Sequence, residues 1–431
     1  MISLLVLYMV NQLLLPGHVE HVVGFDGFRS ALESVFGPLS VRQLASQIFG
    51  LYAGFVYFTP VLGGWVADRW IGQRNAVVLG ALSMSGGHIA MAFDHSFLLA
   101  LLLLVAGSGL LKGNISAQVG GIYPKDHEGR RTRGFVIFST AINFGAVTGP
   151  LVCGFLGIHY GWHAGFGLAA IFMLAGLATY LTGFKYLPAK VERAILAAAP
   201  MNRGDWTVVA ALVAVMAIAV FQSIAYYQLA NVLPIWLQEH GNLNAAGFRI
   251  PVPWFASIDP LASMVAVPFL FAIWKRQSKR SGREPSDLAK IGTGAWVCAL
   301  ANLVLVGAIA AAGDRPVLWV WPFLYSVLQG VGFIYYWPTL LALVSRCAPP
   351  KVNSTMMGIA FLTLFVANNL IGWVGTFYET MTPLAFWAMH AAIAAAGAIL
   401  VLLFGPGLRR ILEPMETQGL RPAAMTEETE R

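Results

Sequence analysis

Residues 63–74 read GGWVADRWIGQR and connect two apolar stretches, residues 43–66 and 73–93. Each stretch has about the 20 residues that an α-helix needs to cross about 30 Å of hydrocarbon. The connection carries charged side chains, and its glycines allow two helices to approach closely. The segment therefore predicts a helical hairpin that crosses a membrane twice and turns in water.

The same alternation of apolar stretch and short gap continues along the chain. Hydrophobic residues make up 58% of the sequence and charged residues only 11%, about half the charged fraction of a soluble domain. Strands of a membrane barrel would alternate in polarity, and these stretches do not, so we expect an all-α polytopic membrane protein. The further candidate spans lie near residues 96–118, 134–157, 163–184, 206–237, 254–274, 288–312, 317–345, 355–377 and 383–405.

The formal net charge of +7 invites a nucleic-acid partner, but the placement of the basic residues argues against one. They follow every second span, and by the positive-inside rule the side they mark is cytoplasmic. We therefore expect a multi-pass protein of a bacterial cytoplasmic membrane with both termini in the cytoplasm. The basic clusters comprise Arg69 and Arg74; Lys125, Arg130, Arg131 and Arg133; Lys185, Lys190, Arg193 and Arg203; Lys275, Arg276, Lys279, Arg280 and Arg283; Arg346 and Lys351; and Arg409 and Arg410.

The basic segment 186–205 divides the spans into two groups, which predicts a bundle at residues 1–185 and a second at 206–405. Two six-helix bundles joined by a cytoplasmic linker form a transporter in which one half rocks against the other. Within the linker, residues 189–199 have the pattern of an amphipathic interfacial helix. Residues 406–431 are polar and predict a disordered cytoplasmic tail, and residues 17–42 predict an external loop.

The first span reads MISLLVLYMVNQLLL at residues 1–15 and is too short to cross a bilayer. No basic segment precedes it and no cleavage signal follows, so a signal peptide is not expected. Our interpretation is a truncated first helix whose start is missing. The alternative is a short, tilted or interfacial helix.

Several polar side chains interrupt the apolar spans. Lys112 lies inside the fourth span, where a charge is costly and marks a functional site. Tyr57 and Asn143 are candidates for substrate contact, although each alone is more often an interhelical hydrogen bond. Asp259 precedes Pro260 at the start of a span, so it suits proton or ammonium binding and helix capping equally.

Polar stripes run along the spans near residues 206–237 and 317–345. Such stripes often line an aqueous cavity, and the alternative is interhelical packing with satisfied hydroxyls. The first stripe holds Tyr227 and Gln228, and interrupted helices are expected near Pro234 and Pro338. His88 and His390 lie inside spans and are expected to be structural.

The chain shows no enzyme constellation, because it has no phosphate loop, zinc-protease helix or nucleophile elbow. Its three cysteines, Cys153, Cys298 and Cys347, have no paired spacing and predict neither a disulfide nor a metal site. We expect no enzyme activity, no cofactor and no metal.

Three segments together resemble a known family. GGWVADRWIGQR, with Gly64, Asp68, Arg69 and Arg74, is similar to the cytoplasmic loop signature of the major facilitator superfamily. With LLKGNISAQVGGIYP and FSTAINFGAVTGPLVCGFLG it resembles the proton-dependent oligopeptide transporter family of that superfamily. VPWFASIDPLASMVAVPFLFAIWKR and FIYYWPTLLALVSRCAPPKVNSTMMGIAFLT look like the eighth and the tenth to eleventh helices of that family. The resemblance implies that Lys112, Tyr57 and Asn143 line a peptide site, with the Lys facing the carboxyl end of the peptide.

The departures from the family concern its acids. The family has a Glu-x-x-Glu-Arg motif in its first helix, which would lie upstream of Met1. It usually has Glu at the positions of Tyr227 and Phe333, Trp at that of Ala360, and Asn at that of Asp259. Proton symport needs a carboxylate that titrates, so Asp259 becomes the candidate in the second half.

The sequence therefore predicts a monomeric symporter that couples uptake of di- or tripeptides, or related small solutes, to protons. Its site would comprise Lys112, Tyr57, Asn143, Tyr227 and Gln228, with Asp259 as the proton-coupling candidate. A proton-uncoupled facilitator or an exporter of amphipathic solutes is one alternative. A non-transporting sensor or a defective remnant is another.

Overall fold

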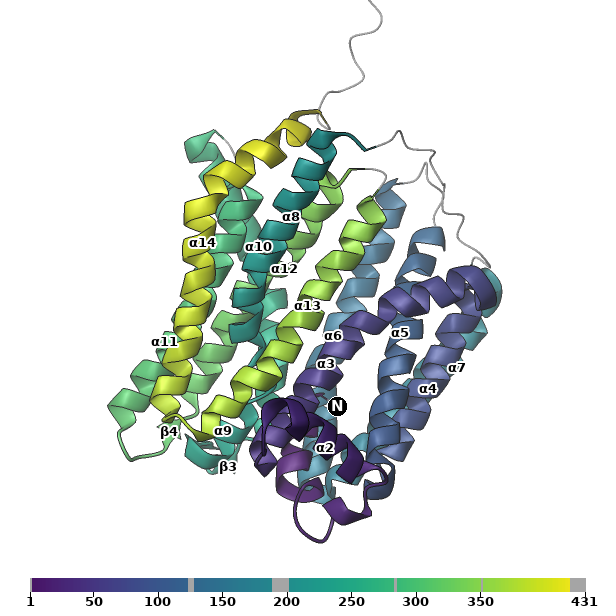
Figure 1. Cartoon of the computed structure of the whole chain (residues 1–431), viewed down its shortest axis with the longest axis vertical. Coiled ribbons are helices and arrows are strands. Elements are labelled where there is room, and N and C mark those ends of the chain that lie inside the picture. Colours follow the sequence, from purple (N-terminus) through teal and green to yellow (C-terminus); the bar gives the residue numbers. More distant parts are fainter. Residues whose placement is uncertain (1, 123–127, 188–200, 283–284, 350–351, 419–431) are drawn as a thin grey trace, which may run out of the picture.

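A computed structural model of the chain describes residues 2–122, 128–187, 201–282, 285–349 and 352–418. It is helical almost throughout (Figure 1). In the first half the helices are α1 Ile2–Tyr8, α2 Phe25–Phe36, α3 Val41–Val66, α4 Gly72–Ala90, α5 Phe97–Ile122, α6 Glu128–Tyr160 and α7 Trp162–Gly183. In the second half they are α8 Arg203–Tyr227, α9 Leu233–His240, α10 Phe255–Ser281, α11 Asp287–Ala312, α12 Val320–Cys347, α13 Asn353–Gly375 and α14 Pro383–Gln418.

Short elements connect these helices. The 3₁₀ turns are Val19–His21, Asp94–Ser96, Phe184–Tyr186, Val252–Trp254 and Thr376–Glu379, and the π-helical turns are Met9–Leu13 and Ala67–Ile71. Strands β2 (Asn244–Ala245) and β3 (Phe248–Arg249) pair antiparallel, with Asn244 opposite Arg249. Strands β1 (Gly241–Asn242) and β4 (Val317–Leu318) pair in parallel, with Gly241 opposite Val317.

The predicted membrane spans are confirmed as helices. Ten helical segments in the described ranges are long and apolar enough to cross a membrane. One of them, Val41–Ala90, is 50 residues long and holds both α3 and α4. It folds back at the π turn Ala67–Ile71, where Gly72 has a φ of +76°. This is the hairpin that residues 63–74 predict.

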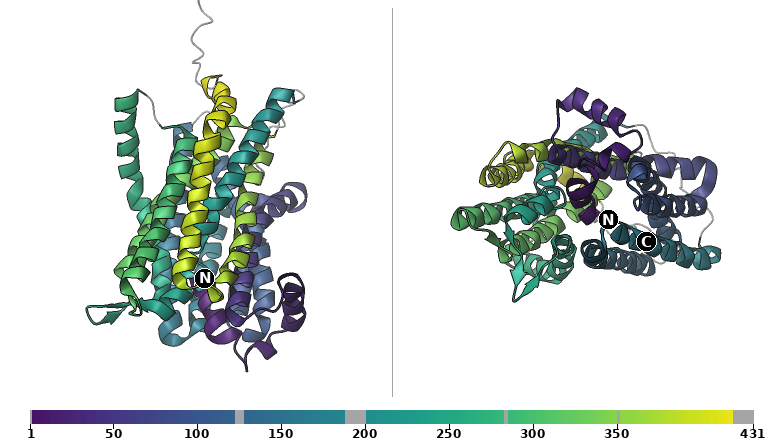
Figure 2. Two further views of the ribbon diagram at one scale, coloured as in Figure 1. Left: turned by 60° about the vertical axis from the view of Figure 1, so that its left-hand side comes forward. Right: turned by 90° about the horizontal axis from the view of Figure 1, so that it is seen from below.

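The helices form two bundles (Figures 1 and 2). Helices α3 to α7 pack together in the first bundle, and α8 and α10 to α14 in the second. The bundles meet where α3 packs on α13 and α6 packs on α10. We call the end of the molecule with α2 and the β2–β3 hairpin the hairpin end, and the end where α14 finishes the tail end (Figure 1).

The first helical segment runs from Ile2 to Leu13 and lies inside the fold. It is shorter than every candidate span, yet Leu4 to Met9 are at most 1% exposed. These side chains pack in the same apolar core as Phe49, Trp236 and Trp387. The expectation of a missing start stays a prediction.

Two of the next three segments differ from the sequence expectations and one agrees with them. Residues 17–42 contain the amphipathic helix α2, whose Phe25 and Leu32 share one face and pack on the core. The span near residues 206–237 breaks between α8 and α9, as expected near Pro234, whereas α12 continues through Pro338. Neighbouring helices can accommodate the backbone groups that such a proline leaves free.

The disordered tail was predicted to begin at residue 406, which is wrong for the part that the structure describes. Helix α14 continues to Gln418. Leu408, Ile411 and Leu412 fall on one face of it and pack on the core of the second bundle. The predicted interfacial helix at residues 189–199 and the tail beyond Gln418 lie outside the described residues.

Candidate substrate site between the bundles

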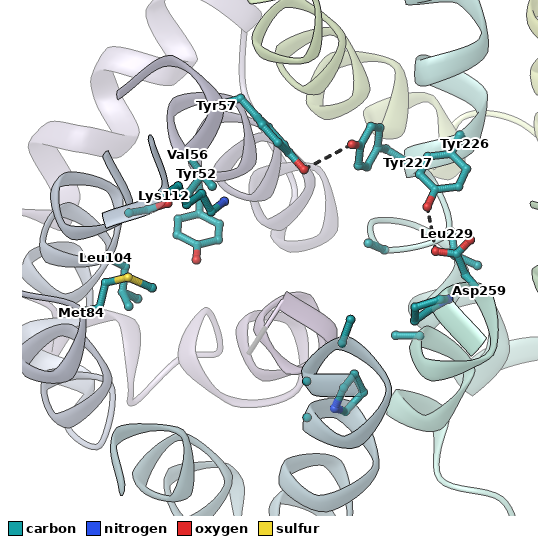
Figure 3. A pocket seen from close by; sticks show the side chains of 18 of the residues that line it. Tyr52, Val56, Tyr57, Met84, Leu104, Lys112, Tyr226, Tyr227, Leu229 and Asp259 are labelled. Carbon is teal, nitrogen blue, oxygen red and sulfur yellow. Dashed lines mark hydrogen bonds between the residues drawn. The ribbon is translucent and has the colours of Figure 1, made fainter. Parts of the chain in front are cut away.

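A cavity of about 510 Å³ lies between the two bundles (Figure 3). Helices α3, α4, α5 and α6 line it from the first bundle, and α8, α10 and residues 229–230 from the second. Its walls are mostly apolar, with a few polar groups, as in typical small-molecule sites. Four of the six predicted substrate and proton residues line it, namely Tyr57, Lys112, Tyr227 and Asp259.

Lys112 supplies the positive charge of this cavity. It lies on α5, whose sequence before it is an apolar run, and its side chain is exposed to the cavity. The Nζ atom lies 5.1 Å from the ring centroid of Tyr57, within the range of a cation–π contact. No carboxylate in the described part of the chain lies within ion-pair distance of it. The ammonium group is therefore available to an anionic ligand.

Asp259 supplies the negative charge from the other bundle. Its Oδ2 atom accepts a hydrogen bond of 2.7 Å from the hydroxyl of Tyr226, and its Oδ1 atom has no partner among the described groups. Helix α10 begins at Phe255, so Asp259 lies inside it and does not cap it. The structure therefore argues against the capping role, and the proton- or ammonium-binding role of Asp259 stays a prediction.

Tyr57 and Tyr227 connect the two bundles across the cavity. Their hydroxyl oxygens lie 3.3 Å apart, and Tyr227 also packs edge-on against Tyr226, with ring centroids 4.9 Å apart (Figure 3). Contacts therefore run from the Lys112 ammonium through three tyrosines to the Asp259 carboxylate.

Asn143 and Gln228 are not among the lining residues. Asn143 is half-buried on α6, three residues before Ala146, which does line the cavity. Gln228 is fully buried, and its Nε2 atom donates to the carbonyl of Ile371 at 3.5 Å. Its Oε1 atom accepts from Asn231 at 3.3 Å, so this side chain packs at the break between α8 and α9.

Phe333 and Ala360, two of the positions that depart from the family pattern, both pack against apolar neighbours. The ring of Phe333 stacks on that of Tyr226, with centroids 5.2 Å apart. Ala360 is fully buried in the core of the second bundle. Neither position supplies a charge to the cavity.

In the turn at residues 63–74, Gly63 packs closely against α5 and Gly64 does not. A Cβ atom on Gly63 would lie 2.2 Å from the carbonyl oxygen of Gly109, whereas one on Gly64 would meet nothing within 4 Å. Asp68 accepts a 3.5 Å hydrogen bond from Gln73, and the Arg74 guanidinium lies 5.1 Å from the ring centroid of Phe184. Arg69 is exposed.

The lining residues that were not predicted as site residues include His88 and Ser108. His88 was expected to be structural, yet its buried Nδ1 atom has no hydrogen-bond partner in the described part of the chain, and neither has the Ser108 hydroxyl. A signal was present in the sequence. Ser108 precedes Lys112 by four residues, which places both on one face of a helix.

The bundles are held together at the hairpin end. Arg42 on α3 pairs with Glu239 on α9 at 2.5 Å, and Ser46 accepts a 2.7 Å hydrogen bond from Asn231. A Cβ atom on Gly50 would lie 2.6 Å from the carbonyl oxygen of Asn368, so α3 and α13 are in backbone contact there. The cavity is therefore closed between the bundles toward the hairpin end.

No group of three or more His, Cys, Asp or Glu residues able to hold a metal ion occurs in the part of the chain that the structure describes. The three cysteines, Cys153, Cys298 and Cys347, are buried.

Comparisons with known proteins identify the family. The family model described as Major Facilitator Superfamily matches residues 1–372. The uncharacterized transporter YclF of Bacillus subtilis (strain 168) is 26% identical, over 88% of this chain and 89% of that protein. The di-/tripeptide transporter of Lactococcus lactis subsp. cremoris is also 26% identical, over 85% and 87% of the two chains.

A solved structure has the same fold. The crystal structure of a mutant of peptide transporter POT in complex with alafosfalin superposes with a TM-score of 0.81 at 24% identity, covering 96% of this chain and 92% of that one. The chain therefore belongs to the Major Facilitator Superfamily, and its resemblance to the peptide-transporter branch of that superfamily is confirmed.

Proposed function

We propose that this protein is a secondary active transporter that takes up di- and tripeptides, or related small solutes, together with protons. One observation carries the proposal: a cation from one bundle and a carboxylate from the other line a single cavity. The names of the relative and of the solved structure, a di-/tripeptide transporter and a peptide transporter, support the same substrate class.

A dipeptide suits the charges of this cavity. At neutral pH it carries a carboxylate at one end and an ammonium group at the other. Lys112 would bind the carboxylate and Asp259 the ammonium group, and charge-assisted hydrogen bonds of this kind are the strong ones. Tyr57 and Tyr227 lie between the two charges and would contact the peptide bond. Asn143 and Gln228 do not line the cavity and would act indirectly, by supporting the residues that do.

Asp259 is also our candidate for proton coupling. It is the one carboxylate among the lining residues, and ionisable groups inside membrane spans typically mark proton or ion pathways. Gain and loss of a proton at this carboxylate would change the charge of the cavity during each transport cycle. Each proton that enters adds about 2.3 kcal/mol of driving force per 100 mV of membrane potential.

Alternating access would rock the bundle of residues 1–185 against that of residues 206–405 about the linker 186–205. The basic end of α10, with Lys275, Arg276, Lys279 and Arg280, lies at the tail end. By the positive-inside rule the tail end then faces the cytoplasm of a bacterial inner membrane, and the hairpin end faces outward. The structure would thus represent the state that is closed to the outside. A monomer would suffice for this transport cycle, because both bundles belong to one chain.

A proton-uncoupled facilitator is the second candidate. It is favoured by Tyr227 and Phe333, which stand where the family usually has Glu. Uptake that is insensitive to a protonophore would support it.

The proposal is tested with purified protein in liposomes that take up labelled Ala-Ala under an inward proton gradient. Replacing Lys112 by Ala is expected to lower uptake at least tenfold. The matched control is Lys290→Ala, because Lys290 lies over the ring of Trp274 and outside the cavity. Uptake by the Lys112→Ala protein near that of the unmodified protein would contradict the proposal.

A further inference from the structure

We propose that His88 and Ser108 form a specificity subsite for an uncharged hydrogen-bonding group on the substrate residue next to the carboxylate. Three further residues, Tyr52, Met84 and Leu104, line the cavity together with these two. We call the five residues the His88 subsite. The inference rests on the proposed function, because it places the peptide carboxylate on Lys112.

Three helices bring the subsite together. Met84 and His88 are four residues apart on α4, and Leu104, Ser108 and Lys112 are spaced by four on α5, so each set shares one helical face. Glycines let the two helices approach closely. A Cβ atom on Gly107 would lie 2.7 Å from the Met84 Cγ atom, and one on Gly87 would lie 2.7 Å from the Leu104 Cγ atom.

The hydroxyl of Ser108 is buried and has no hydrogen-bond partner in the described part of the chain. A serine inside a helix commonly donates to the carbonyl four residues earlier, and Ser85, Ser223 and Ser326 do so at 2.8 to 3.1 Å. Ser108 makes no such bond, and its Oγ atom has no partner among the described residues. Buried polar groups are usually hydrogen-bonded, so this hydroxyl calls for a partner that enters the cavity.

The imidazole of His88 has the same property. It is 6% exposed and lines the cavity, and its Nδ1 atom has no hydrogen-bond partner in the described part of the chain. A neutral imidazole offers one donor and one acceptor. Together with the hydroxyl it can satisfy a ligand group that both donates and accepts, such as a hydroxyl or a carboxamide.

The surroundings define the rest of the ligand. Tyr52, Met84 and Leu104 supply aromatic and aliphatic walls, which suit an apolar stem or ring. Ser108 lies one helical turn, about 6 Å, from Lys112 along α5. A basic side chain would be repelled by Lys112, and a second carboxylate would find no further cation among the lining residues. The subsite therefore fits an uncharged polar group on an apolar side chain, such as that of tyrosine.

The test compares binding of Ala-Tyr and Ala-Phe to the purified full-length protein by isothermal titration. The two peptides differ by one hydroxyl, and a hydrogen bond of ordinary strength predicts that Ala-Tyr binds about tenfold more tightly. His88→Leu is expected to bring this ratio to about one while the affinity for Ala-Phe changes less than about twofold. Ser108→Ala should lower the ratio about threefold.

Two control variants separate recognition from folding. His88→Asn keeps a hydrogen-bonding group and should retain a preference for Ala-Tyr. Ser85→Ala should leave the ratio unchanged, because Ser85 bonds within α4 and does not line the cavity. Equal binding of the two peptides by the unmodified protein, or an unchanged ratio in His88→Leu, would overturn the subsite alone. Absence of binding by both peptides would overturn the proposed function with it.

Discussion

The hydroxyl oxygen of Tyr57 in the first bundle lies 3.3 Å from that of Tyr227 in the second. The rings meet edge-on with centroids 6.4 Å apart, directly between the positions of Lys112 and Asp259 (Figure 3). At the Tyr227 position, where the family resemblance implies a Glu, this chain thus has a neutral contact between the bundles. Its remaining charges lie at either side of that contact.

The tyrosine pair should act as one unit in stability. Tyr57→Phe and Tyr227→Phe each remove one hydroxyl, and each is expected to destabilise the protein by about 1 kcal/mol. Because one hydrogen bond joins them, the double variant should cost about as much as either single variant. Thermal unfolding of the four proteins in detergent measures the coupling. Fully additive effects would mean that the two hydroxyls do not interact.

Asp259 should separate proton coupling from substrate movement. Asp259→Asn cannot release a proton, so accumulation driven by a pH gradient should be lost. Exchange of internal for external peptide, which needs no net proton movement, should persist at reduced affinity. Asp314→Asn is the matched control, because Asp314 is exposed and does not line the cavity. Undiminished accumulation by the Asp259→Asn protein would assign coupling to another group.

The two glycines of the α3–α4 turn should respond differently to the same change. A methyl group on Gly63 would collide with the backbone of Gly109, and overpacking of this kind costs about 1 to 3 kcal/mol. Gly64→Ala meets open space and should be close to neutral. Thermal stability of the two single variants in detergent checks the order, and equal losses would contradict the packing described for α3 and α5.

The Arg42–Glu239 ion pair should favour the state that is closed at the hairpin end. Partly exposed pairs contribute up to about 1 kcal/mol, so Arg42→Ala should shift the population by at most about fivefold. Spin labels at the exposed residues Val35 and Leu318 would report a longer distance. Exchanging the two charges, with Arg42→Glu and Glu239→Arg together, should restore the original distances. A distance distribution unaffected by Arg42→Ala would remove the pair from the closing mechanism.

Apolar length made the membrane helices predictable, because lipid allows little besides helices in spans of this composition. Helix α2 and the extension of α14 were missed because both are amphipathic and lie outside the apolar spans. Their stability comes from packing of one face, as with Leu32 and Leu412, and a hydropathy pattern does not report such tertiary contacts.

The charged residues of the candidate site could be predicted from the sequence. Lys112 and Asp259 stand out in apolar sequence, and the structure brings both to one cavity. Neutral residues do not stand out from an apolar sequence in this way. Gln228 and Tyr227 are neighbours in one polar stripe, but only Tyr227 reaches the cavity, because adjacent helical residues point about 100° apart. His88 was interpreted as structural because a lone histidine inside a span usually is. Its Nδ1 atom without a hydrogen-bond partner can be recognised only in the structure, once the neighbouring residues are placed.

The most direct test of the central claim, that Lys112 and Asp259 hold opposite ends of one substrate, is a binding cycle with modified ligands. Binding of Ala-Ala, its C-terminal amide and its N-acetyl derivative is measured for the unmodified, Lys112→Ala and Asp259→Asn proteins. We predict that Lys112→Ala weakens binding of Ala-Ala at least tenfold but leaves that of the amide unchanged, because the amide lacks the carboxylate. Asp259→Asn should likewise weaken Ala-Ala and leave the N-acetyl derivative unchanged. Equal losses for all three ligands in either variant would contradict the claim.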